Sequence, residues 1–372
     1  MEEWIDCKIA DLGTVIGGAT PSTKKLEYYE NGSIAWITPK DLSTFRGRYI
    51  RRGERNITEL GLKSCSTQLL PKNTVLFSSR APIGYIAIAE NDLCTNQGFK
   101  SVIPNENTDP LFLYYLLKYN KNKIESMGSG TTFKEISGNT MKNIVVSVPR
   151  DKKVQEQISS MLGVIDNKIE SNEKINNNLE QQAIAIFDNM FPDISTAEKA
   201  IGDIIIPKRG KNLLSKNAIL GNVPVVAGGL NPSTYHNTAN TVAPVLSISA
   251  SGANAGYVNL WNIPIWSSDS SFIDSSMSND VYFWYVLLKK RQNEIYDSQT
   301  GSAQPHIYPQ HIAAMPICDL NFNKVSNYTS IVTPIFELIG HNKIENMRLI
   351  TIRDALVPKL ISGDLDVSNI SL

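Results

Sequence analysis

The sequence predicts an α+β protein in which one mixed α/β unit occurs twice and two long antiparallel helices join the copies as a coiled coil. Three observations support this fold class: an internal repeat, two heptad seams with the same polar centre, and short β-branched runs punctuated by Pro and Gly. The 372 residues suit two or three domains, and the hydrophobic content of 42% is enough to build buried cores.

The internal repeat is clearest around a short apolar helix. Phe112–Lys118 reads FLYYLLK, and 171 residues later Phe283–Lys289 reads FWYVLLK. Upstream, Gly84–Ile86 matches Gly256–Val258 with nearly the same offset, whereas matches near the start of each copy have an offset about 20 residues larger. We therefore expect the first copy to carry an insertion of about 20 residues upstream of Gly84.

Within each copy, strands are expected before the short helix. Asn73–Phe77 and Ile83–Ala89 are apolar or β-branched runs bounded by Pro and Gly, which is typical of strands and turns. Pro110–Lys123 is expected to be helical, because Pro opens it and leucines recur on one face. The equivalent segments of the second copy are Val245–Ile248, Gly256–Leu260 and Asp280–Ile295.

Two long helices follow the two globular parts. The segment Gln155–Met190 alone would extend about 54 Å at 1.5 Å per residue. Its seam residues alternate steps of four and three, and a seam shifted by 170 residues has the same apolar ends and two central asparagines. An ordinary amphipathic helix on a core is the alternative, but the shared polar centre favours an antiparallel coiled coil with facing asparagines. The seam residues are Leu162, Ile165, Ile169, Asn172, Asn176 and Leu179, then Ile335, Ile339, Asn342, Asn346, Leu349 and Leu356.

These signals divide the chain into four segments. Residues 1–150 and 193–322 are expected to be the globular copies, residues 151–192 the first long helix, and residues 323–372 the second helix and tail.

The charge distribution points to local basic patches. Lys plus Arg and Asp plus Glu both number 36, so a uniformly basic protein that coats DNA is excluded. The segment from Lys40 to Arg55 is nevertheless basic and contains Phe45 and Tyr49, so it can hold phosphates and offer arginine to guanine. A solvated surface loop is the alternative for this segment.

The sequence lacks the motifs of the common classes of enzyme. The sequence contains no phosphate-binding G-x-x-x-x-G-K-[ST], no G-x-G-x-x-G, no H-E-x-x-H, no G-x-S-x-G and no Pro-Pro of an adenine methyltransferase loop. The four cysteines lie far apart, without metal or redox spacing. An enzyme of unrecognised class that uses His306 and His311 remains an alternative. No apolar run approaches the length of a membrane span, so we expect a soluble, cytoplasmic protein without membrane contact.

Five pieces of sequence resemble a known family and occur in its order. They are Gly17–Ser22 with Ala35–Leu42, Ser79–Tyr85, Gly128–Lys134 with its counterpart Thr300–Ile307, Gln155–Ile158, and Arg353–Gly363. On these segments the chain resembles, over nearly its whole length, the specificity subunit of a type I restriction–modification system.

The resemblance implies that each copy is a target recognition domain for one half of a split, asymmetric sequence on double-stranded DNA. The helices would set the gap between the halves and dock two adenine-methyltransferase subunits, with restriction subunits beyond them. S-adenosylmethionine and ATP would belong to those partners, and the chain would catalyse nothing. A structural coiled-coil tether without DNA binding is the remaining alternative.

The expected DNA contacts come from basic segments and Gly-rich loops. The alternative for Arg80 is a loop arginine that forms a salt bridge within the protein. The alternative for the residues of the Gly-rich loops is a tight turn without a DNA contact. The second copy has Asn254 and Gly252 where the first has Pro82 and Arg80, so the two domains are expected to read different sequences. The candidates are Lys40, Arg46, Arg48, Arg80, Thr131, Thr132, Lys134, Lys208, Arg209, Asn254, Gln304 and His306.

Overall fold

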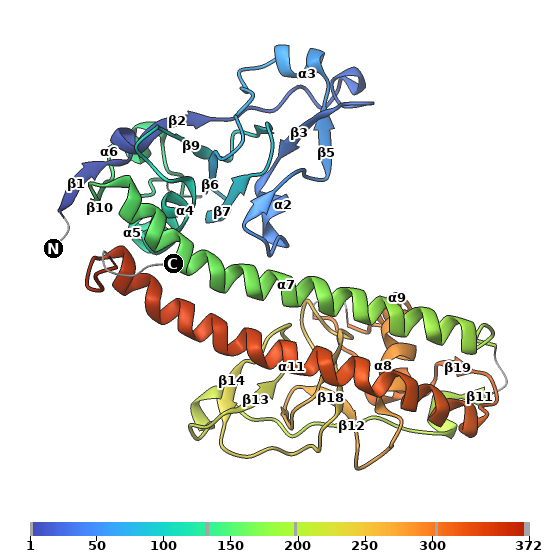
Figure 1. The fold of residues 1–372 in the computed structure, drawn as a ribbon. Coiled ribbons are helices and arrows are strands. Elements are labelled where there is room, and N and C mark those ends of the chain that lie inside the picture. Colours follow the sequence, from blue (N-terminus) through green and yellow to red (C-terminus); the bar gives the residue numbers. More distant parts are fainter. Residues whose placement is uncertain (1–2, 131–133, 197–198, 302–303, 368–372) are drawn as a thin grey trace. The chain divides into compact units, whose positions relative to one another are not determined.

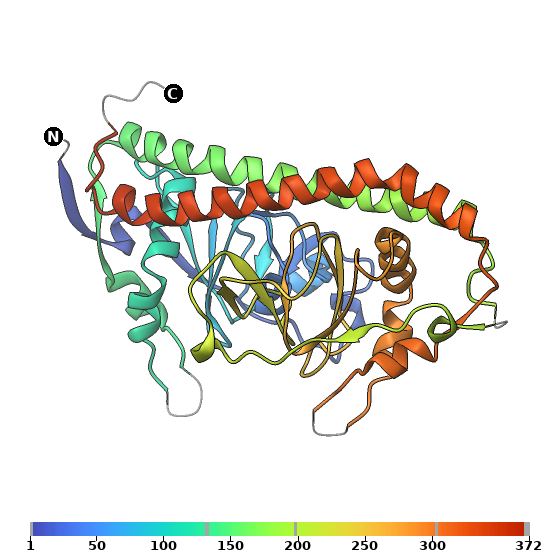
Figure 2. The ribbon, with the colours of Figure 1, turned by 90° about the horizontal axis from the view of Figure 1, so that it is seen from below.

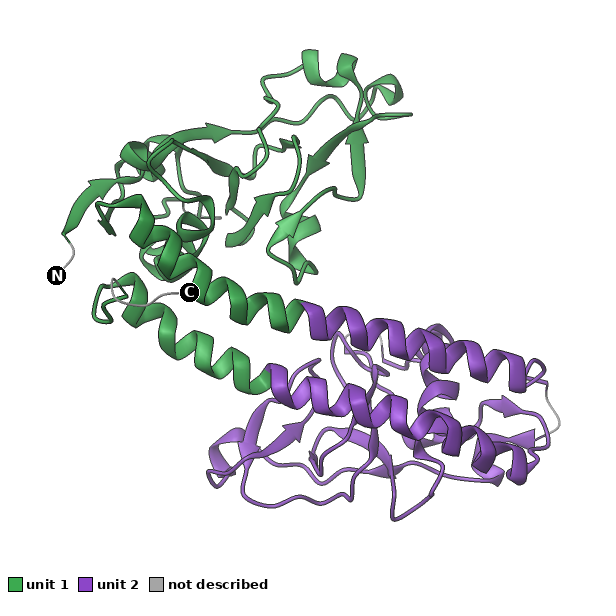
Figure 3. Cartoon of the chain, viewed as in Figure 1, with its two compact units in different colours: residues 1–170, 347–372 green, residues 171–346 purple. Residues whose placement is uncertain are grey.

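The computed structural model describes residues 3–130, 134–196, 199–301 and 304–367. The chain forms two compact units: unit 1 is Met1–Glu170 with Met347–Leu372, and unit 2 is Ser171–Asn346 (Figure 3). Each unit combines a mixed α/β globular part with portions of the helices α7 (Lys152–Met190) and α11 (Phe322–Ile361) (Figure 1). No helix in the described part of the chain is long and apolar enough to span a membrane.

Unit 1 is built on a five-stranded sheet in the order β2-β9-β6-β7-β4. β9 and β7 both pair antiparallel with the central β6, β2 pairs antiparallel with β9, and β4 pairs parallel with β7. These strands are β2 (Gly13–Gly17), β4 (Tyr49–Ile50), β6 (Val75–Ser79), β7 (Ile83–Ala89) and β9 (Lys100–Pro104).

A second, three-stranded sheet of unit 1 has β3 at its centre, antiparallel to β5 and parallel to β8. The terminal strand β1 pairs antiparallel with β10. The strands are β1 (Trp4–Lys8), β3 (Ile34–Ile37), β5 (Arg55–Ile57), β8 (Cys94–Thr95) and β10 (Val145–Pro149).

The helix α4 (Pro110–Tyr119) covers the large sheet of unit 1. Pro110 opens it, and the Asp109 carboxylate caps it by accepting from the Phe112 amide at 2.7 Å, as expected for a helix start. Phe112 and Tyr115 are fully buried in the same core as Phe77 of the sheet and Leu162 of α7. The short helices are α1 (Ile9–Leu12), η1 (Leu26–Tyr28), α2 (Pro39–Ser43), α3 (Glu59–Lys63), α5 (Lys121–Ser126) and α6 (Gly138–Asn143).

Unit 2 has the same kinds of strand pairing. Its four-stranded sheet has the order β12-β18-β15-β16, all antiparallel, and its three-stranded sheet has β13 antiparallel to β14 and parallel to β17. The strands are β11 (Lys199–Ala200), β12 (Lys208–Arg209), β13 (Val223–Val226), β14 (Thr234–His236), β15 (Val245–Ser249), β16 (Val258–Trp261), β17 (Trp266–Ser267), β18 (Ser270–Asp274) and β19 (Pro316–Ile317).

The helix α8 (Val281–Lys290) lies in unit 2 as α4 does in unit 1, with its apolar side chains in the core. Phe283 packs against Phe187 of α7, with ring centroids 5.5 Å apart, and Tyr328 of α11 meets the same Phe187 ring edge-on at 5.4 Å. Aromatic burial of this kind anchors both long helices to the unit. The other helices are η2 (Ile201–Asp203), η3 (Ser215–Asn217), α9 (Gln292–Asp297) and α10 (Pro309–Ala313).

The extra length of the first copy lies in two connections. Residues 38–54 join β3 to β5, whereas residues 227–233 join β13 to β14. Residues 58–74 then join β5 to β6, whereas the shorter segment 237–244 joins β14 to β15 in unit 2. The first of these longer connections contains the basic segment and the strand β4, for which the large sheet of unit 2 has no equivalent among the described residues.

Candidate nucleic-acid interface

The basic segment of unit 1 begins on a capped helix. The Asp41 carboxylate accepts from the Thr38 amide at 2.7 Å and from the Glu54 amide at 2.7 Å, which ties the start of α2 to the end of the segment. Lys40 pairs with Glu54 at 2.8 Å, and both side chains are exposed. Arg46 lies on the same connection and is exposed. Lys40 and Arg46 are thus accessible to a ligand.

Arg48 differs from the expectation of a DNA contact. It is 3% exposed, and its Nε lies 3.0 Å from a Glu170 carboxylate oxygen while its Nη2 donates to Asn167. Burial opposes its charge, but the hydrogen bond to Glu170 and the nearby charges of Tyr115, Glu170 and Asp166 together outweigh burial and raise the Arg48 pKa above its ordinary value. In this position the side chain has no surface for a phosphate, so we reassign Arg48 to a structural ion pair with α7.

The loop of unit 1 that follows α5 returns to the sheet at Glu135. Its residues Thr131 and Thr132 lie outside the described residues, and Lys134 is exposed. Glu135 forms an isolated β-bridge with Arg80, just beyond β6, and one of its carboxylate oxygens lies 3.6 Å from Arg80 Nη1. The other oxygen lies 3.4 Å from Lys100 Nζ on β9. Arg80 is thus an ion-paired residue with 37% of its side chain exposed.

The corresponding place in unit 2 also holds a carboxylate. Asp269, just before β18, pairs through one oxygen with Arg209 Nη2 at 2.5 Å and accepts from the Ser251 hydroxyl through the other. Lys208, the neighbour of Arg209 on β12, is exposed. Arg209 therefore lies at the sheet with 40% of its side chain exposed and one nitrogen engaged.

The remaining candidates of unit 2 surround the loop after α9. Gln304 is exposed, whereas Asn254 is half-buried in a turn in which its carbonyl accepts from the Tyr257 amide at 3.0 Å. His306 forms β-bridges with Ser251 and Thr300, and its ring stacks on Tyr308 at 6.0 Å.

The other histidine of interest, His311, meets the same Tyr308 ring edge-on at 5.6 Å. In the described part of the chain, no group of three or more His, Cys, Asp or Glu side chains is arranged to hold a metal ion.

All twelve predicted seam residues are buried or half-buried. In unit 2, Asn172 donates to Asn346 at 2.8 Å and to Glu345 at 2.7 Å, and Asn342 donates to Asn176 at 2.8 Å. These pairings require the parts of α7 and α11 within this unit to run antiparallel, as Figures 1 and 2 show. The facing asparagines expected from the sequence are therefore present.

In unit 1 the two helices meet through a buried ion pair. Asp166 accepts from Arg353 Nη1 at 2.8 Å and from the Tyr115 hydroxyl at 2.6 Å, which joins α7 to α11 and to α4. Burial, followed by the charge of Asp166, raises the pKa of Tyr115 above its ordinary value. Burial opposes the charge of Arg353, but the hydrogen bonds to Asp166 and Asp354 and the charges of these two carboxylates together raise the Arg353 pKa above its ordinary value.

Comparison with known proteins places these features in a family. Residues 1–181 match the family model described as "Type I restriction modification DNA specificity domain". The chain is 34% identical to the "Type I restriction enzyme MjaIX specificity subunit" of Methanocaldococcus jannaschii, over 99% of this chain and 95% of that protein. This chain belongs to the family of type I restriction specificity subunits.

Further relatives of this specificity subunit agree. It is 36% identical, over 29% of its length, to the "Type I restriction enzyme EcoR124I/EcoR124II specificity subunit" of Escherichia coli, of which the match covers 27%. Its fold is similar to the crystal structure of a type I restriction–modification S subunit from M. genitalium, with a TM-score of 0.62 and 20% identity, covering 97% of this chain and 96% of that one.

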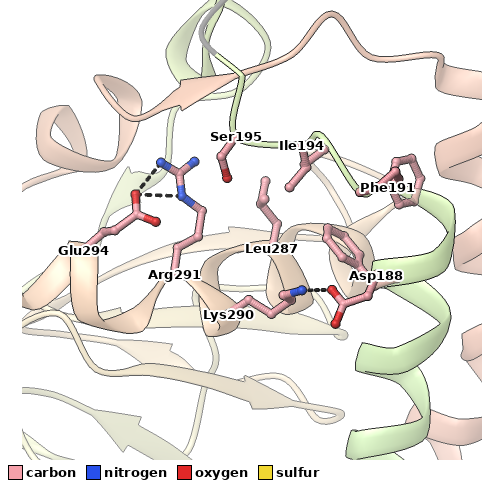
Figure 4. A pocket seen from close by; sticks show the side chains of 10 residues that line it. Asp188, Phe191, Ile194, Ser195, Leu287, Lys290, Arg291 and Glu294 are labelled. Atoms are coloured by element: carbon pink, nitrogen blue, oxygen red, sulfur yellow. Dashed lines mark hydrogen bonds and ion pairs between the residues drawn. The ribbon is translucent and has the colours of Figure 1, made fainter.

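A pocket of about 340 Å³ in unit 2 of the specificity subunit is lined by the end of α7, by α8 and by α9, and none of the predicted DNA-binding residues lines it (Figure 4). Its charged lining is internally neutralised, because Lys290 pairs with Asp188 and Arg291 pairs with Glu294. Arg291 is also buried and donates to the Pro316 carbonyl at 2.6 Å. These charges hold α8, α9 and the end of α7 together.

The sequence did not point to the acidic residues at this specificity subunit's candidate interface. Glu135 and Asp269 each contact a predicted basic residue, and Lys100 and Ser251 complete the two groups. The available signal was the end of the Gly-rich loop, where Glu135 and His306 occupy equivalent places. The burial of Arg48 against α7 could not be predicted, because the internal repeat does not show where the insertion folds.

Proposed function

We propose that this specificity subunit reads a split, asymmetric target on double-stranded DNA, with one half-site for each unit. The observation that supports this function best is the shared strand pairing of the two units combined with different side chains at equivalent loop positions. A duplicated target recognition domain with altered contacts reads two related but unlike sequences.

In this proposal, α7 and α11 form an antiparallel coiled coil that sets the gap between the half-sites. The asparagine pairs of unit 2 and the Asp166–Arg353 pair of unit 1 support it, because each fixes the register of the two helices. A fixed register gives a fixed length, and half-site spacing then follows from the geometry of the protein.

The chemistry is assigned to partner subunits. Two adenine-methyltransferase subunits would dock on the specificity subunit and flip an adenine in each half-site, and restriction subunits would join that complex. S-adenosylmethionine and ATP would bind those partners. This chain would act without catalysis of its own, in keeping with a sequence that has none of the common catalytic motifs.

Removing the exposed Arg46 side chain tests the DNA-binding surface. If Arg46 contacts phosphate, Arg46→Ala should weaken DNA binding by a similar factor for all sequences and flatten the dependence of log K on log salt by about one unit. The measurement is a binding titration at several salt concentrations, with the complex of specificity and methyltransferase subunits.

Arg150→Ala provides a matched control, because Arg150 is an exposed arginine paired with Glu3 at 2.8 Å, outside the basic segment. It should leave the salt slope unchanged. If wild-type protein shows no salt-dependent affinity for DNA, the tether without DNA binding is the correct interpretation. If Arg46→Ala keeps the full slope, the basic segment lies away from the phosphates.

A further inference from the structure

A carboxylate bridges two donors at the base of the same loop in each unit. In unit 1 the Glu135 oxygens face Arg80 at 3.6 Å and Lys100 at 3.4 Å, one oxygen to each cation. In unit 2 one Asp269 oxygen pairs with Arg209 at 2.5 Å, and the other accepts from Ser251. Both groups therefore hold an arginine beside a carboxylate whose oxygens are both engaged.

The two places are equivalent in backbone structure. Arg80 bridges to Glu135, which also bridges to Ser129, and Ser251 bridges to His306, which also bridges to Thr300. The next amide in each loop closes the same hydrogen bond at 2.9 Å, from Ile136 to the Ser79 carbonyl and from Ile307 to the Ala250 carbonyl.

The polar groups at this shared place come from different positions. The carboxylate belongs to the loop in unit 1, as Glu135, and to the sheet in unit 2, as Asp269. The arginine follows β6 in unit 1, as Arg80, and lies on β12 in unit 2, as Arg209. The backbone is retained while the side chains that reach the surface are exchanged, which is the pattern expected of positions that read different sequences.

The carboxylate beside each arginine disfavours phosphate as the ligand, although Lys100 leaves the group of unit 1 with one net positive charge. In unit 2 the Arg209–Asp269 pair has no net charge, and a phosphate approaching Arg209 would meet the Asp269 carboxylate. The edge of a base is uncharged and escapes this repulsion. In the major groove a G·C pair offers the O6 and N7 acceptors of guanine beside the N4 donor of cytosine, which matches an arginine beside a carboxylate.

We propose that Arg80 with Glu135, and Arg209 with Asp269, are specificity-determining pairs that each read a G·C base pair in their half-site. The arginine donates to guanine, since the ion pair engages one of its nitrogens and leaves other donors of the fork. The carboxylate holds the guanidinium in place and repels phosphate. This inference rests on the proposed function and deepens it, because it predicts at least one G·C pair in each half-site.

The test replaces each carboxylate by its amide in the complex with methyltransferase subunits. Methylation is measured on a DNA library in which every position of both half-sites is randomised. Glu135→Gln should reduce the preference for one G·C pair of one half-site at least tenfold and leave the other half-site unchanged, and Asp269→Asn should do the same in the other half-site. Unchanged preferences in both variants would overturn the inference.

Two matched controls remove an ion-paired carboxylate elsewhere in each unit. Glu3→Gln removes the partner of Arg150, and Asp319→Asn removes the partner of Lys199. Both should keep the wild-type preference at every position. If they relax the same base pairs as the test variants, a general loss of structure is responsible and the inference falls.

Arg80→Lys gives a second variant, which keeps the charge but loses the planar fork. It should lose the same G·C preference as Glu135→Gln while the salt slope of binding stays the same. A uniform weakening on all sequences would show a phosphate contact and contradict the inference. If the wild-type complex modifies no split target at all, the proposed function fails instead, so the two failures are distinguishable.

Discussion

Asp166→Ala is expected to lower the free energy of unfolding of unit 1 by about 3 kcal/mol, because it leaves the Nη1 group of the largely buried Arg353 and the buried Tyr115 hydroxyl without their acceptor. The Asp166 side chain is 6% exposed and Arg353 is 16% exposed. Urea unfolding measures the change, and hydrogen exchange of α4 and α7 shows that it falls in unit 1.

Asp354→Ala is the matched control, because Asp354 also pairs with Arg353 at 2.8 Å but is 60% exposed. Solvent screens such a pair, so the expected loss is below about 0.5 kcal/mol. Equal effects of the two substitutions would mean that the buried network does not hold the helices together.

A paired deletion in the two helices is expected to change the gap in the DNA target rather than to abolish its recognition. Removing residues 171–177 together with 341–347 excises one heptad from each helix, including the four facing asparagines. Seven residues correspond to about 10 Å of helix, or about three base pairs at 3.4 Å each. Because a heptad nearly preserves the phase of the seam, both half-sites should remain the same while the gap shortens by about three base pairs.

The control removes residues 171–177 alone, which leaves α11 out of register with α7. This variant should lose stability and methylation without gaining a new target. The measurement is methylation of DNA substrates that carry both half-sites with gaps of different length. An unchanged preferred gap in the paired deletion would contradict the role of the helices as a spacer.

The sequence predicted the features that are periodic or repeated. The alternating spacing from Leu162 to Leu179 requires one helix face, and that face is buried or half-buried throughout. Pro110 marked the start of α4, because its fixed φ favours the first turn of a helix, and the structure adds the Asp109 cap. The shared offsets also located the loops whose ends form equivalent bridges.

The sequence could not predict where single charges meet. Arg48 belongs to a basic segment, yet the parallel pairing of β4 with β7 directs it to Glu170, which is 122 residues away in the chain. Asp269 and Arg209 are 60 residues apart and meet because β12 pairs with β18. Such contacts depend on tertiary pairing, and no local propensity encodes them.

A genome-wide map of N6-methyladenine in the host, with the gene intact, disrupted and restored, tests most directly whether this chain selects a DNA target. If this chain selects the DNA target, methylation at one split motif, made of two unlike half-sites around a gap of undefined sequence, disappears on disruption and returns on restoration. A map that stays the same in cells where mass spectrometry detects the protein would contradict the claim that this chain selects a DNA target.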